Sequence, residues 1–169
     1  MATQIKERGV VTAGKTRLIA EPGKQEIIIT RLFDAGQEGL FKALTDPQLI
    51  PQWCGAPGQA NTAVDRMEVR PGGIWRWRFI DAQGNGVGLH GFYHEVLPPE
   101  RLVYTFEYEG VPGHVLLRTV KLEDRAGQTL LTEQSVFQSI EDRDGMLQSG
   151  VKEGTIASWD RLEALLRKR

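Results

Sequence analysis

In the stretch Ile74-Trp75-Arg76-Trp77-Arg78-Phe79, aromatic and charged side chains alternate from Trp75 onward. Because successive side chains of a β-strand point to opposite faces, the three aromatic residues share one face and the two arginines share the other. A sheet with an aromatic face must cover that face with another element. The stretch therefore predicts an amphipathic strand in a sheet that packs against a second layer.

Further runs with the same period of two follow and precede this stretch, and turn residues separate them at hairpin distance. The six predicted strands are 62–70, 74–81, 86–97, 101–109, 114–123 and 129–137. Such short links join antiparallel neighbours, because a parallel pair would need a crossover of roughly a dozen residues or more. A seventh strand is predicted over 24–33, where β-branched residues are dense, and 16–20 is a candidate short edge strand.

Helices are expected on both sides of this run of strands. Two short ones are predicted after the first strand, over 37–44 with Asp34 as its cap, and from 47 to about 53. Ser139 and Asp142 resemble the capping box that opens a helix, and we expect one long C-terminal helix from there. One face of that helix is lined by Val151, Thr155, Trp159, Leu162 and Leu166.

Together these elements predict an α+β fold, in which a seven-stranded curved antiparallel sheet wraps around a long C-terminal helix. We expect a single domain over residues 16–169 that follows a flexible N-terminal tail, residues 1–15. A chain of 169 residues, 40% of them hydrophobic, can bury roughly 70% of its unfolded surface without metal or disulfide. We therefore expect no metal and no cofactor.

The charge balance limits the choice of partner. The chain carries 21 Lys+Arg and 22 Asp+Glu, which gives a net charge of −1. Such a chain does not attract phosphates as a whole, so we expect neither a nucleic-acid partner nor membrane insertion. The one cysteine cannot form an internal disulfide, and residues 1–15 lack the apolar run of a signal peptide. We therefore expect a cytoplasmic protein.

A curved sheet that grips one helix tends to leave a cavity between the two. The residues expected to line it and to bind a ligand are mostly aromatic. They are Trp53, Trp75, Trp77, Phe79, Phe92, Tyr104, Phe106, His114, Arg118, Glu133, Phe137 and Trp159. The pattern leaves open which face of 87–96 points inward.

Arg118 and Glu133 share the inward parity of two adjacent strands. An unpaired buried charge costs several kcal/mol, so we expect the two side chains to pair. The pair fits two interpretations, a structural ion pair at the end of the cavity or a polar anchor that orients a ligand.

Other chemistry-bearing residues give weaker signals. His90 and His94 lie four apart on a strand without clustered Cys or Asp, which does not favour a metal site. Cys54 has no visible base nearby and is expected to be an inert thiol. The small residues Gly150, Gly154 and Ser158 recur along the last helix, where they allow either close packing on the sheet or space for a ligand.

Five segments occur in an order typical of a known family: 26–35, 45–47 followed by Gln52-Trp53, 70–73, 98–103 and 141–146. Over roughly residues 16 to 167 the chain resembles the activator of heat-shock protein 90 ATPase-like family of the SRPBCC, or START-like, superfamily, which includes the birch-pollen allergen. The resemblance implies the helix-grip fold, with two short helices after the first strand. The chain departs from the family pattern at Gly36, Gly39 and Cys54.

The resemblance also implies a function, since superfamily members hold hydrophobic molecules in this cavity and only some are catalysts. We expect a non-catalytic protein that binds a small hydrophobic or amphipathic molecule between the sheet and the C-terminal helix. One alternative is a polyketide-cyclase-like or hydrolase-like enzyme that uses cavity polar residues. A further alternative is a chaperone-ATPase regulator that acts through protein contacts, and a homodimer is left open.

Overall fold

A computed structural model describes residues 9–55, 59 and 61–169, and its described strands form one antiparallel sheet in the order β1-β2-β3-β9-β8-β7-β6-β5-β4. The strands are β1 (Val10–Ala13), β2 (Thr16–Ile19), β3 (Glu26–Phe33), β4 (Asn61–Met67), β5 (Ile74–Ile80), β6 (Gly86–Leu97), β7 (Arg101–Tyr108), β8 (Val115–Arg125) and β9 (Gln128–Val136). The helices are α1 (Gln37–Thr45), α2 (Ile50–Trp53), α3 (Ile140–Gln148) and α4 (Val151–Arg167). Within these residues no helix has the length and apolar character needed to cross a membrane.

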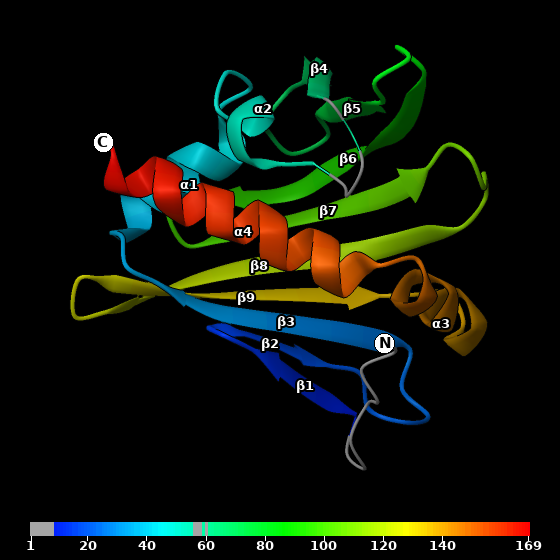
Figure 1. The fold of residues 1–169 in the computed structure, drawn as a ribbon, viewed down its shortest axis with the longest axis horizontal. Coiled ribbons are helices and arrows are strands. Elements are labelled where there is room, and N and C mark those ends of the chain that lie inside the picture. The colour runs from blue at the N-terminus through cyan, green and yellow to red at the C-terminus, as the bar shows by residue number, and fades with distance from the viewer. Residues whose placement is uncertain (1–8, 56–58, 60) are drawn as a thin grey trace.

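The sheet curves around α4, which lies across its inner face, as predicted (Figure 1). Helices α1 and α2 lie beside the C-terminal half of α4, and α3 lies at its N-terminal end. All six strands predicted downstream of residue 60 are present, and each pairs antiparallel with its chain neighbour. The α+β architecture with a helix gripped by an antiparallel sheet is confirmed.

The prediction of seven strands is wrong, because β1 and β2 extend the sheet beyond β3 to nine. Strand β1 lies within the segment predicted to be a flexible tail, and its residue Val11 is buried opposite Leu18 of β2. The exposed edge of β3 offers unpaired backbone groups, and a short hairpin turned at Gly14 satisfies them. The candidate edge strand predicted at 16–20 is present as β2, whereas the four residues of β1 were not predicted to form a strand. Residues 1–8 of the predicted tail lie outside the described residues.

The helices also differ from expectation at their ends. Ser139 does cap α3, with its Oγ accepting from the Asp142 N–H at 3.0 Å, but the predicted single long helix is two helices. Gly150 adopts a left-handed backbone, with φ of 85°, which glycine tolerates without steric cost, and the chain changes direction there. Asp34 does not cap α1, which begins after Gly36, and α2 begins at Ile50 rather than 47.

One buried ion pair holds α4 on the sheet. Arg31 of β3 and Glu163 of α4 are 4% and 6% exposed, and Arg31 Nη2 lies 2.6 Å from Glu163 Oε2. The Asp34 backbone N–H and Lys15 Nζ also donate to Glu163 Oε1. Burial alone would raise the pKa of Glu163, but these hydrogen bonds outweigh it and lower that pKa to about 2. The C-terminal half of α4 is thus tied to β3 by charge as well as by apolar packing.

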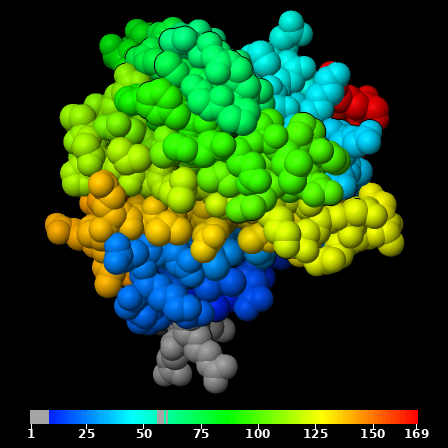
Figure 2. Space-filling model, turned by 180° about the vertical axis from the view of Figure 1, so that it is seen from behind, coloured from blue at the N-terminus to red at the C-terminus, as the bar shows by residue number. Residues whose placement is uncertain are grey.

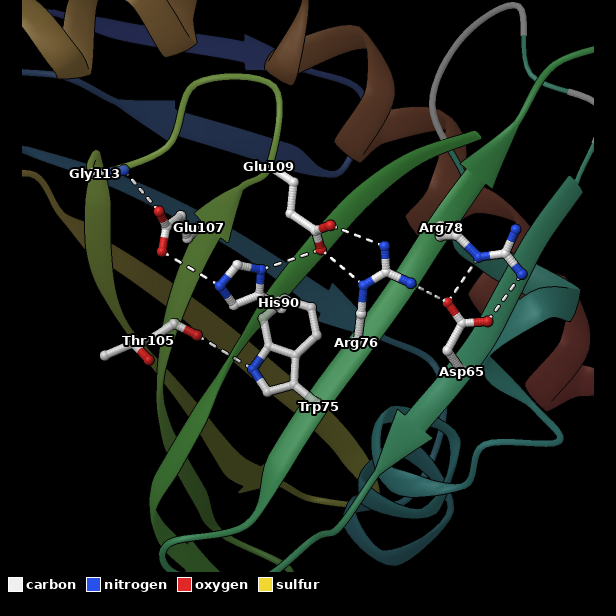
Figure 3. Close-up of polar contacts among 9 residues, drawn as sticks. All are labelled: Asp65, Trp75, Arg76, Arg78, His90, Thr105, Glu107, Glu109 and Gly113. Atoms are coloured by element: carbon white, nitrogen blue, oxygen red, sulfur yellow. Dashed lines mark hydrogen bonds and ion pairs between the residues drawn. The ribbon is translucent and has the colours of Figure 1, made fainter. Parts of the chain in front are cut away.

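The outer face of the sheet is polar where the sequence predicts it. Arg76 and Arg78 of β5 both pair with Asp65 of β4, and Arg76 also pairs with Glu109, whereas Trp75 points to the opposite side (Figure 3). Seen from behind, the strands form most of the molecular surface, and the red C-terminal end of the chain emerges at one edge (Figure 2). The alternation of the stretch 74–79 therefore separates a solvated face from an internal one.

Candidate functional site

A cavity of about 840 Å³ lies between the inner face of the sheet and α4. Of the twelve residues predicted to line it, eleven do. These are Trp53, Trp75, Trp77, Phe79, Tyr104, Phe106, His114, Arg118, Glu133, Phe137 and Trp159. The remaining lining combines aliphatic side chains, mostly from the strands, with small and polar residues, mostly from the helices and loops.

Phe92 is the exception, and its predicted place in the cavity is wrong. Its side chain is 48% exposed on the outer face, whereas Leu89 and Tyr93 of the same strand are buried and line the cavity. A β-bulge between Tyr93 and Glu95 shifts the register of β6, so one strand presents two different parities to the interior. The bulge affects only the residues after Tyr93. Leu89 and Tyr93 share one parity and Phe92 has the other, so the error lies in the choice of a face that the sequence left open.

The aromatic wall of the cavity is held in a defined arrangement. The Trp75 ring lies 5.1 Å from that of Trp77, 5.8 Å from that of Tyr104 and 5.7 Å from that of Phe106, centroid to centroid. The Trp75 indole N–H donates to the Thr105 carbonyl oxygen at 3.2 Å, which orients the ring (Figure 3). Tilted and edge-on contacts of this kind stabilise aromatic clusters beyond simple burial. The wall is therefore a preformed apolar surface.

The polar centre of the cavity is the Arg118–Glu133 pair, and the predicted pairing is confirmed. Arg118 Nε lies 3.4 Å from Glu133 Oε1, and both side chains are 14% exposed. The same Nε donates to Ser135 Oγ at 3.0 Å, and the guanidinium lies 4.9 Å from the centroid of the Phe106 ring. Burial raises the pKa of the adjacent Tyr104 to about 12, so this phenol is uncharged at neutral pH.

Cys54 lines the cavity, and burial raises the pKa of its thiol to about 12. Only the thiolate is a nucleophile. Raising the pKa from 9.0 to about 12 lowers the fraction of thiolate near pH 8 by about a thousandfold. We expect the folded protein to react with a thiol-specific disulfide reagent at least a hundredfold more slowly than the same protein in urea. Equal rates would contradict the burial, and the single cysteine makes the signal unambiguous.

The exposed residues of the cavity lining lie on α3 and around the turn that joins β7 to β8, so we take the mouth of the cavity to lie between these two elements. There His114 Nδ1 lies 2.8 Å from Asp142 Oδ1, and Val111 and Glu141 also line the opening. His114 is largely exposed, so it belongs to the rim rather than to the interior. The rim is built by a helix and a turn that are distant in sequence and linked by this contact.

The small residues of the C-terminal helix provide space. Gly150, Gly154 and Ser158 all line the cavity, which supports the interpretation that they leave room beneath α4. Ser158 also permits close packing, because its Oγ donates to the Gly55 carbonyl oxygen at 2.9 Å. Gly150 and Gly154 therefore leave space for the cavity near the N-terminal end of α4, whereas Ser158, further along the helix, holds the loop at Gly55.

The histidines of β6 lie away from this site. His90 is on the outer face between Glu107 and Glu109 (Figure 3). His94 is exposed. Among the residues with described positions, no group of three His, Cys, Asp or Glu side chains could hold a metal ion.

An antiparallel sheet curled around a C-terminal helix, with a cavity between them, defines the helix-grip class of proteins, of SRPBCC type. The sequence pattern of the family described as Activator of Hsp90 ATPase homolog 1-like protein matches residues 34–167. The chain belongs to this family, which confirms the resemblance carried by its motifs.

Solved structures of bacterial proteins share the fold. A crystal structure of a Rhodobacter sphaeroides protein has a TM-score of 0.84 and 27% identity, and covers 92% of this chain and 99% of that one. A solution structure of an Arthrobacter aurescens protein has a TM-score of 0.81 and 22% identity, with 90% and 91% of the two chains covered. A Mycobacterium smegmatis protein has a TM-score of 0.80 and 20% identity, with 93% and 96% covered. No curated protein matches the sequence.

Proposed function

We propose that this protein binds a small hydrophobic or amphipathic molecule in the cavity between the sheet and α4. The observation that carries the proposal is the cavity itself, about 840 Å³ lined largely by aromatic and aliphatic side chains. Sites for small molecules typically span roughly 300–1,000 Å³ and combine such walls with a few polar groups. Side chains that line an empty space lose their packing partners, so a ligand of matching shape gains the contacts that the chain itself leaves unmade.

The arrangement of the lining supports binding. The Trp75 cluster offers rigid apolar area, and the Arg118–Glu133 pair places one polar centre within it. No observation on the described residues favours the enzymatic or the chaperone-regulating alternative over binding.

The test uses N-phenyl-1-naphthylamine, an uncharged dye whose fluorescence rises in apolar surroundings. We expect saturable binding to the protein, and we expect Leu116→Trp to weaken it at least tenfold. Leu116 of β8 is buried and lines the cavity, so a larger side chain there fills ligand space.

The matched control is Leu117→Trp, the same substitution one residue along, on the exposed outer face. Thermal unfolding of both variants establishes that they are folded. The proposal fails if the dye does not bind saturably, or if the two variants bind it equally well. Native mass spectrometry of protein purified from its own host then identifies any retained molecule.

A further inference from the structure

The charges that line the cavity are unequally distributed between its interior and its mouth. Among the described lining residues the interior has one guanidinium, Arg118, and one carboxylate, Glu133. The rim has two carboxylates, Glu141 and Asp142, with His114 beside the latter. Three carboxylates face one guanidinium, so the lining has a formal charge of −2 when the imidazole is neutral.

We propose, resting on the binding function above, that the cavity selects electrically neutral amphipathic ligands with a hydroxyl or carbonyl group and discriminates against anions such as carboxylates.

The first reason lies in the interior. Arg118 Nε is already engaged, 3.4 Å from Glu133 Oε1 and 3.0 Å from Ser135 Oγ, and the guanidinium lies over the Phe106 ring. An incoming anion would either share Arg118 with Glu133, bringing two like charges together in an apolar cavity, or displace Glu133 and leave it unpaired. Both arrangements bury an uncompensated negative charge.

The second reason is that a cation gains no interior partner either. The carboxylate of Glu133 pairs with Arg118, so a positively charged head group would lose its hydration and meet no unpaired carboxylate among the described interior lining residues. The acidic rim attracts cations only at the mouth. A hydroxyl or carbonyl carries no net charge and can hydrogen-bond to the Arg118–Glu133 pair or to the Tyr104 hydroxyl without breaking the pair.

The rim strengthens the discrimination during association. Glu141 is exposed and Asp142 is half-buried on the first turn of α3, so an anion that approaches the mouth meets two carboxylates. Long-range repulsion of this kind lowers the association rate and weakens with added salt. Rim and interior therefore act in the same direction.

The experiment compares three probes with the same ring system, 2-naphthol, 2-naphthoate and 2-naphthylmethylammonium, as competitors of bound N-phenyl-1-naphthylamine at neutral pH. We expect naphthol to displace the dye at a concentration at least tenfold lower than naphthoate, with the ammonium compound also weaker than naphthol. Naphthoate or the ammonium compound binding as tightly as naphthol would overturn the inference.

Two variants assign the effect to the two parts of the site. Glu133→Gln removes the counter-charge of Arg118, so the ratio of the naphthoate to the naphthol dissociation constant should fall at least tenfold. If that variant does not fold, Glu141→Lys on the exposed rim should lower the same ratio by about two- to fivefold at low salt, an effect that high salt removes. A ratio that stays constant in the folded variants would overturn the inference.

The controls separate this inference from the proposed function. If the dye binds to the cavity but naphthoate competes best, the function stands and the charge selection is wrong. If the dye itself shows no saturable binding, the proposed function fails first.

Discussion

Replacing Glu163 by leucine is expected to lower the free energy of unfolding by about 3–5 kcal/mol. The substitution leaves Arg31, 4% exposed in β3, without its main counter-charge, and Asp160 remains as its only ion-pair partner among the described residues. Removing one partner of a buried pair costs far more than removing a surface pair, because the remaining charge stays desolvated. Urea denaturation at pH 7, followed by circular dichroism, measures the loss.

The matched control is Asp160→Asn, one turn earlier on α4. Asp160 Oδ1 lies 2.7 Å from Arg31 Nη1, but its side chain is largely exposed, so its loss should cost about 1 kcal/mol or less. A leucine variant at 163 that loses no more than the asparagine variant at 160 would show that the pair does not hold α4 on the sheet.

The same pair predicts an acid-dependent loss of stability. The folded-state pKa of Glu163 is lowered from 4.5 to about 2, so its contribution is fully present above pH 4.5 and disappears as the pH falls through 2. A shift of this size corresponds to on the order of 3 kcal/mol. Between pH 5 and 2 the free energy of unfolding of the wild type should therefore fall. The Glu163→Gln variant has no carboxyl group at this position, so its free energy of unfolding should not show this part of the fall. Parallel pH profiles for the two proteins would contradict the lowered pKa.

Replacing Gly91 by alanine is expected to cost about 3 kcal/mol or to prevent folding. A Cβ at this position of β6 would overlap the Thr105 carbonyl oxygen and lie 2.8 Å from the Trp75 indole nitrogen. The carbonyl belongs to the backbone of the neighbouring strand and cannot rotate away, and it accepts the hydrogen bond that orients Trp75. The expected loss is measured by thermal and urea unfolding.

Gly39→Ala provides the opposite expectation. Gly39 lies inside α1, and a Cβ there would make ordinary contact with Leu166 Cδ2 at 3.9 Å. Gly39 is in the first turn of α1, so alanine should raise the free energy of unfolding by up to about 1 kcal/mol, since alanine has the higher helix propensity. A Gly91→Ala variant as stable as Gly39→Ala would mean that β6 can move away from β7 at low cost.

Much of the fold and of the cavity follows from alternation alone. In strands of regular register, such as β5 and β8, a period of two assigns every side chain to a face, and Trp75 and Arg118 lie where the period places them. The Arg118–Glu133 contact was predictable for the same reason, because adjacent antiparallel strands with known parity bring such residues together.

The errors have two physical sources, an ambiguous apolar pattern and a local change of backbone conformation. Apolar side chains of β6 occupy both parities before its bulge, with Leu89 and Tyr93 on one and Phe92 on the other, so alternation alone did not decide which face points inward. The left-handed backbone at Gly150 divides the C-terminal helix, although the sequence on either side favours a helix. Glycine alone does not reveal which conformation it adopts, since it populates both hands of the backbone with similar ease.

By itself, the sequence determined the class of fold, the antiparallel order of the strands from β4 to β9 and the aromatic inner face. These depend on local periodicity and on links too short for any other connection. Only the tertiary structure decided that β1 adds a further strand beyond β2, that α4 is locked to β3 through Arg31 and Glu163, and that the space beneath α4 stays open. Edge pairing, buried charge contacts and unfilled volume depend on the distance between elements remote in sequence, which no local pattern encodes.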